Sequence, residues 1–283
     1  MEKSYNFLVL LLLTSNRSSW FGFAFAPSHQ TSCPFRSVST KRRRLSTSFL
    51  ATSNDGTQSV QPSHKNIVRQ YLGTGPNAIV REGCVLVAPV HEYHHLLMRA
   101  TLFVYAIGLN EEINENVARA VIIDHPTAFT VGEMVDLGSF ENCDSANDIE
   151  QNTMFRGGDM GKDIVMMLHS FDGHYPNKSD MIGTSGVYEG GLAAIMKLAR
   201  DGKIANPDQQ VKFFFNYMEF TESQLDHMFD VTSSENVDNK STDLDSWMSL
   251  EVEASFILNG HYDRGGAWSR LRNAVRDMER SPK

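Results

Sequence analysis

The sequence predicts an α+β fold, in which one domain contains a mixed sheet with helices packed on it. Several short runs are rich in β-branched and aromatic residues, which is typical of buried strands. These runs lie close together, and they do not alternate with long helical segments as a doubly wound sheet requires. Hydrophobic residues make up 41% and charged residues 21% of the 283 residues, which is ordinary for a folded chain.

The predicted strands are the main evidence for the sheet. The last of them alternates polar and apolar residues, so we expect one of its faces to be buried. Residues 61–82 contain Gly73, Gly75 and Pro76, and we predict that they form a loop that leads into the domain. The six strand candidates are Cys84–Ala88, Ala100–Ile107, Arg119–Ile123, Ile164–Leu168, Val211–Phe215 and Trp247–Leu258.

Two helices are predicted to begin at capping boxes, in which a Thr lies three residues before a Glu or Gln. Thr130 and Glu133 start a short helix that ends near Gly138, and Thr221 and Gln224 start a second. Apolar residues at helical spacing predict further helices over 190–199 and 268–278. Polar composition predicts loops over 138–152 and 232–244.

The first 24 residues have the features of a secretory signal peptide. Lys3 gives a basic start, and Phe7–Leu13 is an apolar run that is too short to cross a bilayer. Gly22 and Ala24 are small residues at the positions required for cleavage after Ala24. We therefore expect residues 1–24 to be a signal peptide.

Residues 25–60 have the composition of an organellar transit peptide. They contain 13 Ser or Thr, five Lys or Arg, and one acid, Asp55. Lys41–Arg44 also fits a nuclear signal, although such a signal does not normally follow a secretory one. The junction FGFA-FAPS resembles the bipartite plastid presequences of algae with secondary plastids, such as diatoms. This resemblance implies delivery to the plastid stroma.

Charge and cysteine content exclude several classes of protein. The whole chain has a formal net charge of −8. Residues 1–60 hold seven basic and two acidic residues, which leaves 19 basic and 32 acidic residues and a net charge of −13. This charge repels nucleic acid phosphate and anionic membrane surfaces, so we expect no direct nucleic acid partner. No apolar run has the roughly 18 residues of a membrane span, and three cysteines exclude a disulfide scaffold.

Residues 91–95 (HEYHH) match the H-E-x-x-H pattern of zinc hydrolases. On a helix His91 and His95 would share one face and could bind zinc, with Glu92 as the general base. The motif lies between two strand candidates, which leaves little room for a helix. A carboxylate as third ligand could come only from a predicted loop that contains Glu111, Glu112 and Glu115. We therefore expect a polar surface turn that binds no metal, with a metal-dependent hydrolase as the alternative.

Three further motifs give weaker signals. Residues 73–78 (GTGPNA) fit a dinucleotide fingerprint, but Pro76 and the strand after it contradict the helix that this fingerprint needs. His169, Ser170 and Asp172 lack a nucleophile elbow, so we expect His169 to end a strand. Residues 156–159 (RGGD) are predicted to form a tight turn, with a backbone nest for an anion as the alternative.

The order of these segments resembles the AlgH/YqgE family of bacteria and plant plastids over residues 83–279. The family begins with a strand of the form G-x-L-L-V-A-x-P and continues with motifs such as G-G-P-V and G-Y-x-x-W-x-x-G-Q-L-E. The matching segments here are 83–89 (GCVLVAP), 97–101 (LMRAT), 119–126 (RAVIIDHP), 157–160 (GGDM), 168–169 (LH), 186–191 (GVYEGG) and 216–226 (NYMEFTESQLD).

Several positions depart from the family pattern. Asp124 replaces an Asn and His125 replaces a basic residue. Asp159 replaces a Pro, and Asn216 replaces a Gly. If the family has a functional surface at these positions, this chain has changed it.

The resemblance implies an AlgH-like domain over 83–283, preceded by the lead-in segment 61–82. It implies a largely antiparallel, bifurcated sheet that folds into a pseudo-barrel, and it places HEYHH in the turn between the first two strands. The family has no secure enzymatic activity, and its bacterial name comes from a proposed role in transcriptional regulation. The family-motif positions that could bind a partner are Arg99, Asp124, Pro126, Gly157, Gly158, His169, Tyr217 and Gln224.

We therefore expect a non-enzymatic binding or regulatory protein of the plastid, because no complete catalytic constellation is present. Its partner would be an unidentified protein or small molecule, and we expect no cofactor. The alternatives are the metal-dependent hydrolase and an enzyme of another kind. The candidate site residues of an enzyme of another kind are Arg99, Asp124, His125, His169 and Gln224.

Overall fold

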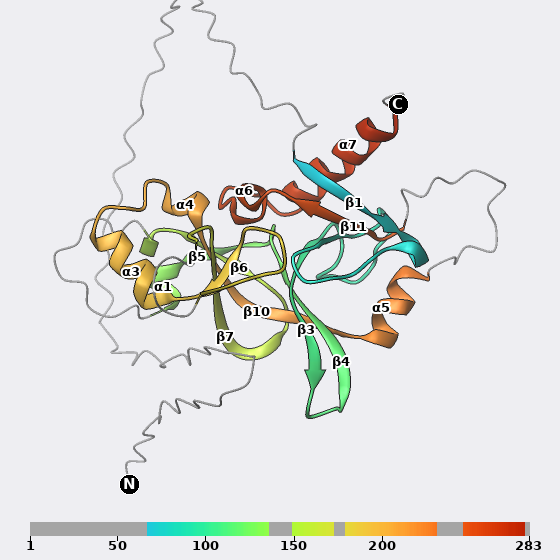
Figure 1. Ribbon diagram of the computed structural model, residues 1–283, viewed down its shortest axis with the longest axis horizontal. Coiled ribbons are helices and arrows are strands. Elements are labelled where there is room, and N and C mark those ends of the chain that lie inside the picture. The colour runs from blue at the N-terminus through green and yellow to red at the C-terminus, as the bar shows by residue number, and fades with distance from the viewer. Residues whose placement is uncertain (1–66, 136–148, 173–178, 231–245, 281–283) are drawn as a thin grey trace, which may run out of the picture. The chain divides into compact units, whose positions relative to one another are not determined.

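The computed structural model describes residues 67–135, 149–172, 179–230 and 246–280, and these form an α+β fold (Figure 1). The predicted fold class is therefore confirmed. The described strands are β1 (Val68–Thr74), β2 (Val85–Val87), β3 (Thr101–Asn110), β4 (Glu115–Ile122), β5 (Pro126–Thr130), β6 (Thr153–Arg156), β7 (Met160–His169), β8 (Ser179–Met181), β9 (Tyr188–Gly190), β10 (Val211–Thr221) and β11 (Met248–Val252). The described helices are the 3₁₀ helix η2 (Gly75–Asn77), α1 (Val131–Met134), α3 (Leu192–Arg200), α4 (Pro207–Gln210), α5 (Glu222–Phe229), α6 (Ala254–Leu258) and α7 (Gly266–Arg280).

The strands of these ranges belong to one open sheet in the order β1-β11-β2-β3-β4-β10-β7-β9-β8. β5 and β6 lie off this path, and β6 pairs in parallel with β10. The other pairs are antiparallel, as expected from the family resemblance. None of the helices described is long and apolar enough to cross a membrane.

The sheet branches at β10. Residues 211–217 of this strand pair with β7, with β6 on the other side, whereas Met218–Thr221 pair with β4. Asn216 lies at a register shift between the two parts and has a φ of 62°. Asn enters this left-handed region more readily than most residues with a side chain, which explains how it can replace a family Gly. The expected bifurcation of the sheet is confirmed.

The paired glycines after β6 lie against this bend of β10. The N–H of Gly157 donates to the carbonyl oxygen of Phe215 at 2.8 Å. A Cβ atom on Gly157 would overlap the carbonyl oxygen of Asn216, and one on Gly158 would overlap the backbone of Tyr217. Neither glycine has a positive φ. The glycines therefore allow a close approach of two backbones, which is the reason for this motif.

One loop prediction and one strand prediction are wrong. The expected loop over 61–82 contains β1, which pairs with β11; only Leu72 of β1 is buried, so the segment has no apolar run. The strand expected over Trp247–Leu258 ends at Val252, and α6 follows. Both faces of β11 are covered, since Ser249 is as fully buried as Leu250. The expectation of a single buried face is therefore also wrong.

Both capping boxes are confirmed. The N–H of Thr130 donates to Glu133 at 2.8 Å, and the N–H of Thr221 donates to Gln224 at 2.9 Å. The helices expected over 190–199 and 268–278 are confirmed as α3 and α7. The predicted presequence over 1–60 and the loop over 232–244 lie outside the described residues, as do residues 138–148 of the other predicted loop.

Candidate functional site

A buried carboxylate lies between the end of β4 and the start of α7. Asp124 is 0% exposed, and it accepts the N–H of Thr101 at 3.2 Å and the N–H of Trp268 at 3.1 Å. Trp268 is in the first turn of α7, so the carboxylate caps this helix and faces the positive end of its dipole. Burial raises the pKa of Asp124 to about 6, although the two backbone hydrogen bonds oppose this shift.

Lys212, near the start of β10, is the buried cation of the same region. Its ammonium group donates to three carbonyl oxygens: Ile123 at 2.6 Å, Asn259 at 2.7 Å and Ile257 at 3.3 Å. An ammonium group has three donors, so all of them are used. The ammonium also lies 3.9 Å from the centre of the Phe155 ring. Burial lowers the pKa of Lys212 well below its usual value, and the charge of Asp124 opposes this lowering.

A second buried cation fixes α7 to the sheet. Arg272 is 1% exposed, and its Nε donates to the carbonyl oxygen of Ala88 at 3.1 Å. Its guanidinium group also donates to the carbonyl oxygen of Ser246 at 3.1 Å. Trp268 Nε1 reaches the same Ala88 oxygen at 2.7 Å. These cations therefore bind backbone oxygens that secondary structure leaves unpaired.

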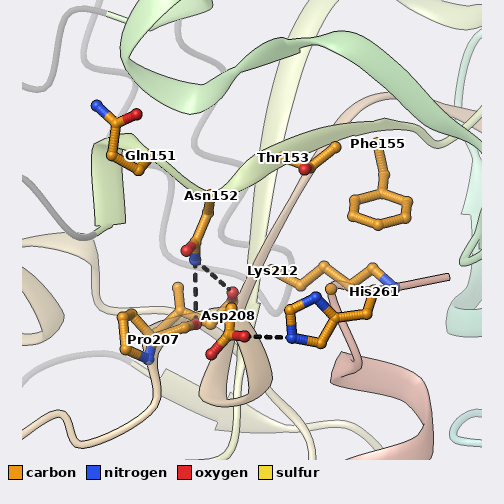
Figure 2. A pocket seen from close by; sticks show the side chains of 10 residues that line it. Gln151, Asn152, Thr153, Phe155, Pro207, Asp208, Lys212 and His261 are labelled. Atoms are coloured by element: carbon orange, nitrogen blue, oxygen red, sulfur yellow. Dashed lines mark hydrogen bonds and ion pairs between the residues drawn. The ribbon is translucent and has the colours of Figure 1, made fainter. Parts of the chain in front are cut away.

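A cavity of about 330 Å³ opens beside Lys212 (Figure 2). The side chains of Asp208 of α4 and His261 are in contact at 2.5 Å, and both are partly exposed. Asn152 Nδ2 donates to the carbonyl oxygens of Pro207 and Val211, both at 3.0 Å. Four of the polar side chains at this cavity, those of Asn152, Asp208, Lys212 and His261, thus contact one another or the backbone.

Arg99 and Arg264 lie near the start of α7, and Arg156 ends β6 and donates its N–H to the carbonyl oxygen of His125. Arg264 Nη2 donates to the carbonyl oxygen of His95 at 2.8 Å, and Arg156 Nε donates to that of Gly158 at 3.3 Å. The guanidinium carbon of Arg99 lies 5.8 Å from the centre of the Trp268 ring. Within the described ranges none of these three arginines forms an ion pair with an acid.

His125 lies beside Arg156, whose N–H donates to its carbonyl oxygen at 2.8 Å. It is 6% exposed, and its Nε2 has no hydrogen-bond partner among the described residues. Burial lowers the pKa of His125 to about 4, and the charges of Arg264 and Arg156 add to this effect. The imidazole is therefore neutral, so the positive charge here belongs to the guanidinium groups.

The structure gathers part of the predicted binding set in this region. Asp124 caps α7, Arg99 contacts the Trp268 ring, and Gly158 accepts from Arg156. Pro126 follows His125 at the start of β5, and Gly157 precedes Gly158.

The other predicted positions lie elsewhere. His169 ends β7, as predicted; its Nδ1 accepts the N–H of Phe171 at 3.2 Å, and its Nε2 lies 3.2 Å from the carbonyl oxygen of Gly190. Burial lowers the pKa of His169 to about 4. Tyr217 lies at the bend of β10, and Gln224 belongs to the capping box of α5. An enzyme of another kind was predicted to use Arg99, Asp124, His125, His169 and Gln224. Among the described contacts, no hydrogen bond joins any two of these residues.

The HEYHH segment forms turns between β2 and β3, as expected from the family resemblance. His91 and His95 are exposed, and Glu92 Oε1 accepts the N–H of His94 at 2.9 Å. The helical face that a zinc site of this type needs is not formed. The described ranges contain no group of three His, Cys, Asp or Glu side chains that could hold a metal ion.

Sequence reasoning missed Lys212, Arg272 and Trp268. A signal existed for Lys212, because a lysine inside the apolar run VKFFF must be paired if the strand is buried. Arg272 occupies a position among the apolar residues of the last helix, next to Leu271. Its burial could have been inferred from helical periodicity.

The fold and site define an α+β protein with a branched sheet and a buried Asp–Lys centre. The chain belongs to the AlgH-like family, because the sequence model of that family (DUF179: AlgH-like) matches residues 98–271. Solved structures that are similar to it include two from named bacteria. A protein from Corynebacterium diphtheriae is 13% identical, with a TM-score of 0.47 over 72% of this chain and 88% of that one.

The second solved structure is the AlgH protein from Pseudomonas aeruginosa. It is 12% identical, with a TM-score of 0.44 over 71% of this chain and 94% of that one. No curated protein matches the chain.

Proposed function

We propose that this protein is a non-enzymatic binding protein of the plastid stroma. The observation that carries the proposal is the pairing of its buried ionisable groups with the backbone. Asp124 accepts two backbone N–H groups, and Lys212 donates to three carbonyl oxygens. These contacts support a structural role for both residues.

The perturbed pKa values of this centre would suit catalysis only if the groups could reach a substrate. A raised carboxyl pKa is typical of a general acid or base, and a lowered lysine pKa is typical of an amine nucleophile. Asp124 is 0% exposed, and three carbonyl acceptors favour the ammonium form of Lys212 over the free amine. A nucleophilic lysine needs an accessible lone pair, which this arrangement does not offer.

Capture from isolated plastid stroma tests the proposal. Residues 61–283 would be immobilised, and the bound molecules would be identified by mass spectrometry before and after incubation. A partner recovered in a stoichiometric amount and chemically unchanged is the expected result. A captured molecule that is consumed, with a product released, would contradict the proposal.

Zinc analysis tests the hydrolase alternative separately. We expect far less than one zinc per chain after dialysis, because His91 and His95 lie in a turn. Stoichiometric zinc that is lost on the double substitution His91→Ala and His95→Ala would establish the hydrolase instead.

The plastid location rests on the FGFA-FAPS junction and the acid-poor segment that follows it. Fusion of residues 1–60 to a fluorescent reporter tests it: the stroma should be labelled, and Phe25→Ala should keep the reporter outside. A secreted or cytosolic reporter from the unaltered fusion would refute this location.

A further inference from the structure

We propose that the N-terminal end of α7 binds an oxyanion, the phosphate or carboxylate group of a small ligand, through Arg99, Arg156 and Arg264. This inference rests on the proposed binding function and gives its ligand a chemical class. The site is formed where Arg264 and Gly265 lead into the helix, next to the buried His125.

The three guanidinium groups have no acidic partner among the described residues, although the chain is acidic. Residues 61–283 carry 32 acids against 19 basic residues. Arg81 and Arg119, by contrast, pair with Glu251 and Glu219 at 2.7 and 2.6 Å. The three arginines of the proposed site contact backbone oxygens or an aromatic ring instead.

The contacts of these arginines hold them in place without using up their donors. A guanidinium group has five N–H donors in a planar fork, and Arg264 and Arg156 each spend one on a carbonyl oxygen. A fork of this kind fits the paired oxygens of a phosphate or carboxylate. Arg99 is fixed by the Trp268 ring and by Gly265, against which its side chain packs.

His125 gives an independent sign of a missing partner. A buried polar nitrogen without a hydrogen bond is rare in folded proteins and requires an explanation. Among the described residues Nε2 of His125 is such an atom. The N–H of Arg156 donates to the carbonyl oxygen of His125 at 2.8 Å, so this ring lies next to one of the three arginines, and the charges of Arg156 and Arg264 both act on it. An oxyanion bound by these arginines would offer Nε2–H an acceptor.

Helix α7 adds to the attraction for an anion. It has 15 residues, and the start of a helix carries partial positive charge. Asp124 already faces this end, but the buried ammonium of Lys212 opposes its charge. Among the described residues, no ion pair with an acid offsets the charges of the three arginines.

Calorimetric titration of residues 61–283 tests the site, with pyrophosphate as the phosphate probe and citrate as the carboxylate probe at constant ionic strength. We expect saturable binding of at least one probe, and the one that binds identifies the chemistry of the ligand. Each of Arg99→Gln, Arg156→Gln and Arg264→Gln should weaken binding about tenfold or more, because each removes a charge-assisted contact. Saturable binding of neither probe would overturn the proposal.

Arg280→Gln is the matched control, since it removes one positive charge from the exposed far end of the same helix. It should leave the affinity unchanged. Equal weakening by Arg280→Gln and Arg264→Gln would show a general charge effect and overturn the site. Thermal melts should show that all four variants fold, because each of these arginines is exposed.

The triple Gln variant separates this inference from the proposed function. If neither probe binds while the triple variant still captures the stromal partner, the oxyanion site is wrong and the binding function stands. If the chain converts a captured molecule into a product, the binding function itself is wrong.

Discussion

The carboxylate of Asp124 accepts the backbone N–H of Trp268 at 3.1 Å, so a residue beyond β4 caps a helix 144 positions later in the chain. The same carboxylate accepts the N–H of Thr101 at the start of β3. One buried side chain thus joins two strands to α7. Lys212 and Arg272 bind further backbone oxygens in the same region. The C-terminal helix is therefore held to the sheet by buried polar contacts as well as by apolar packing.

Removal of a capping hydroxyl should weaken the fold. Thr221→Ala deletes the oxygen that accepts the N–H of Gln224 at 3.3 Å, and we expect a loss of about 1 kcal/mol in the free energy of unfolding. Urea denaturation measures this loss. Ser223→Ala, which removes an exposed hydroxyl from the same helix, is the control and should change stability much less. Equal effects of the two substitutions would mean that the cap has no special role.

The burial of His169 should make stability depend on pH. Its pKa is about 4 in the folded chain and 6.5 ordinarily, so the unfolded chain binds more protons between these values. This residue therefore contributes stability that is present above pH 6.5 and is lost as the pH falls toward 4. His169→Asn should flatten the rise of the unfolding free energy over that window, whereas the exposed His227→Gln should not. An unchanged slope in His169→Asn would contradict the burial of a neutral imidazole.

Glu189 should have the opposite effect on stability. It lies opposite Asp180 in the β8–β9 pair, and burial together with that charge raises its pKa to about 7. The folded chain then binds more protons than the unfolded chain between pH 4.5 and 7, so this residue lowers stability as the pH rises. Glu189→Gln should stabilise the protein at pH 8 and have little effect at pH 4. The exposed Glu112→Gln serves as the control; a destabilised Glu189→Gln at pH 8 would refute the argument.

Strands could be predicted from the sequence where they are buried and therefore contain a run of apolar residues, as in β2, β3 and β10. Prediction failed for β5, β8 and β9, whose residues are exposed or only partly buried and form no apolar run. The strand expected through Leu258 shows a different limit. Its alternation continues past Val252, but apolar spacing in a short segment does not distinguish a strand from a helix.

The candidate site was predicted in part. Asp124 and Arg99 stood out through the resemblance to a family, and both lie at the start of α7. Lys212 and His125 acquire their roles only from distant segments, such as the carbonyl oxygen of Asn259 and the charge of Arg264. A local pattern such as VKFFF indicates that Lys212 must be paired, but it does not identify the distant partners. The HEYHH segment forms the surface turn that was predicted, and the helix on which its zinc pattern depends is not formed there.

A double-mutant cycle on Asp124 and Lys212 tests most directly whether the buried centre is structural. Each single substitution, Asp124→Asn or Lys212→Met, should cost about 2 kcal/mol or more, because it leaves buried partners unsatisfied. The double variant should cost less than the sum of the two by about 1 kcal/mol or more, as expected of groups whose charges interact. Urea denaturation of the four proteins gives this coupling energy. Two outcomes would contradict a structural role for the buried centre. The losses in unfolding free energy of the two single variants could add up to that of the double variant within about 0.5 kcal/mol, or the single variants could be as stable as the unaltered protein.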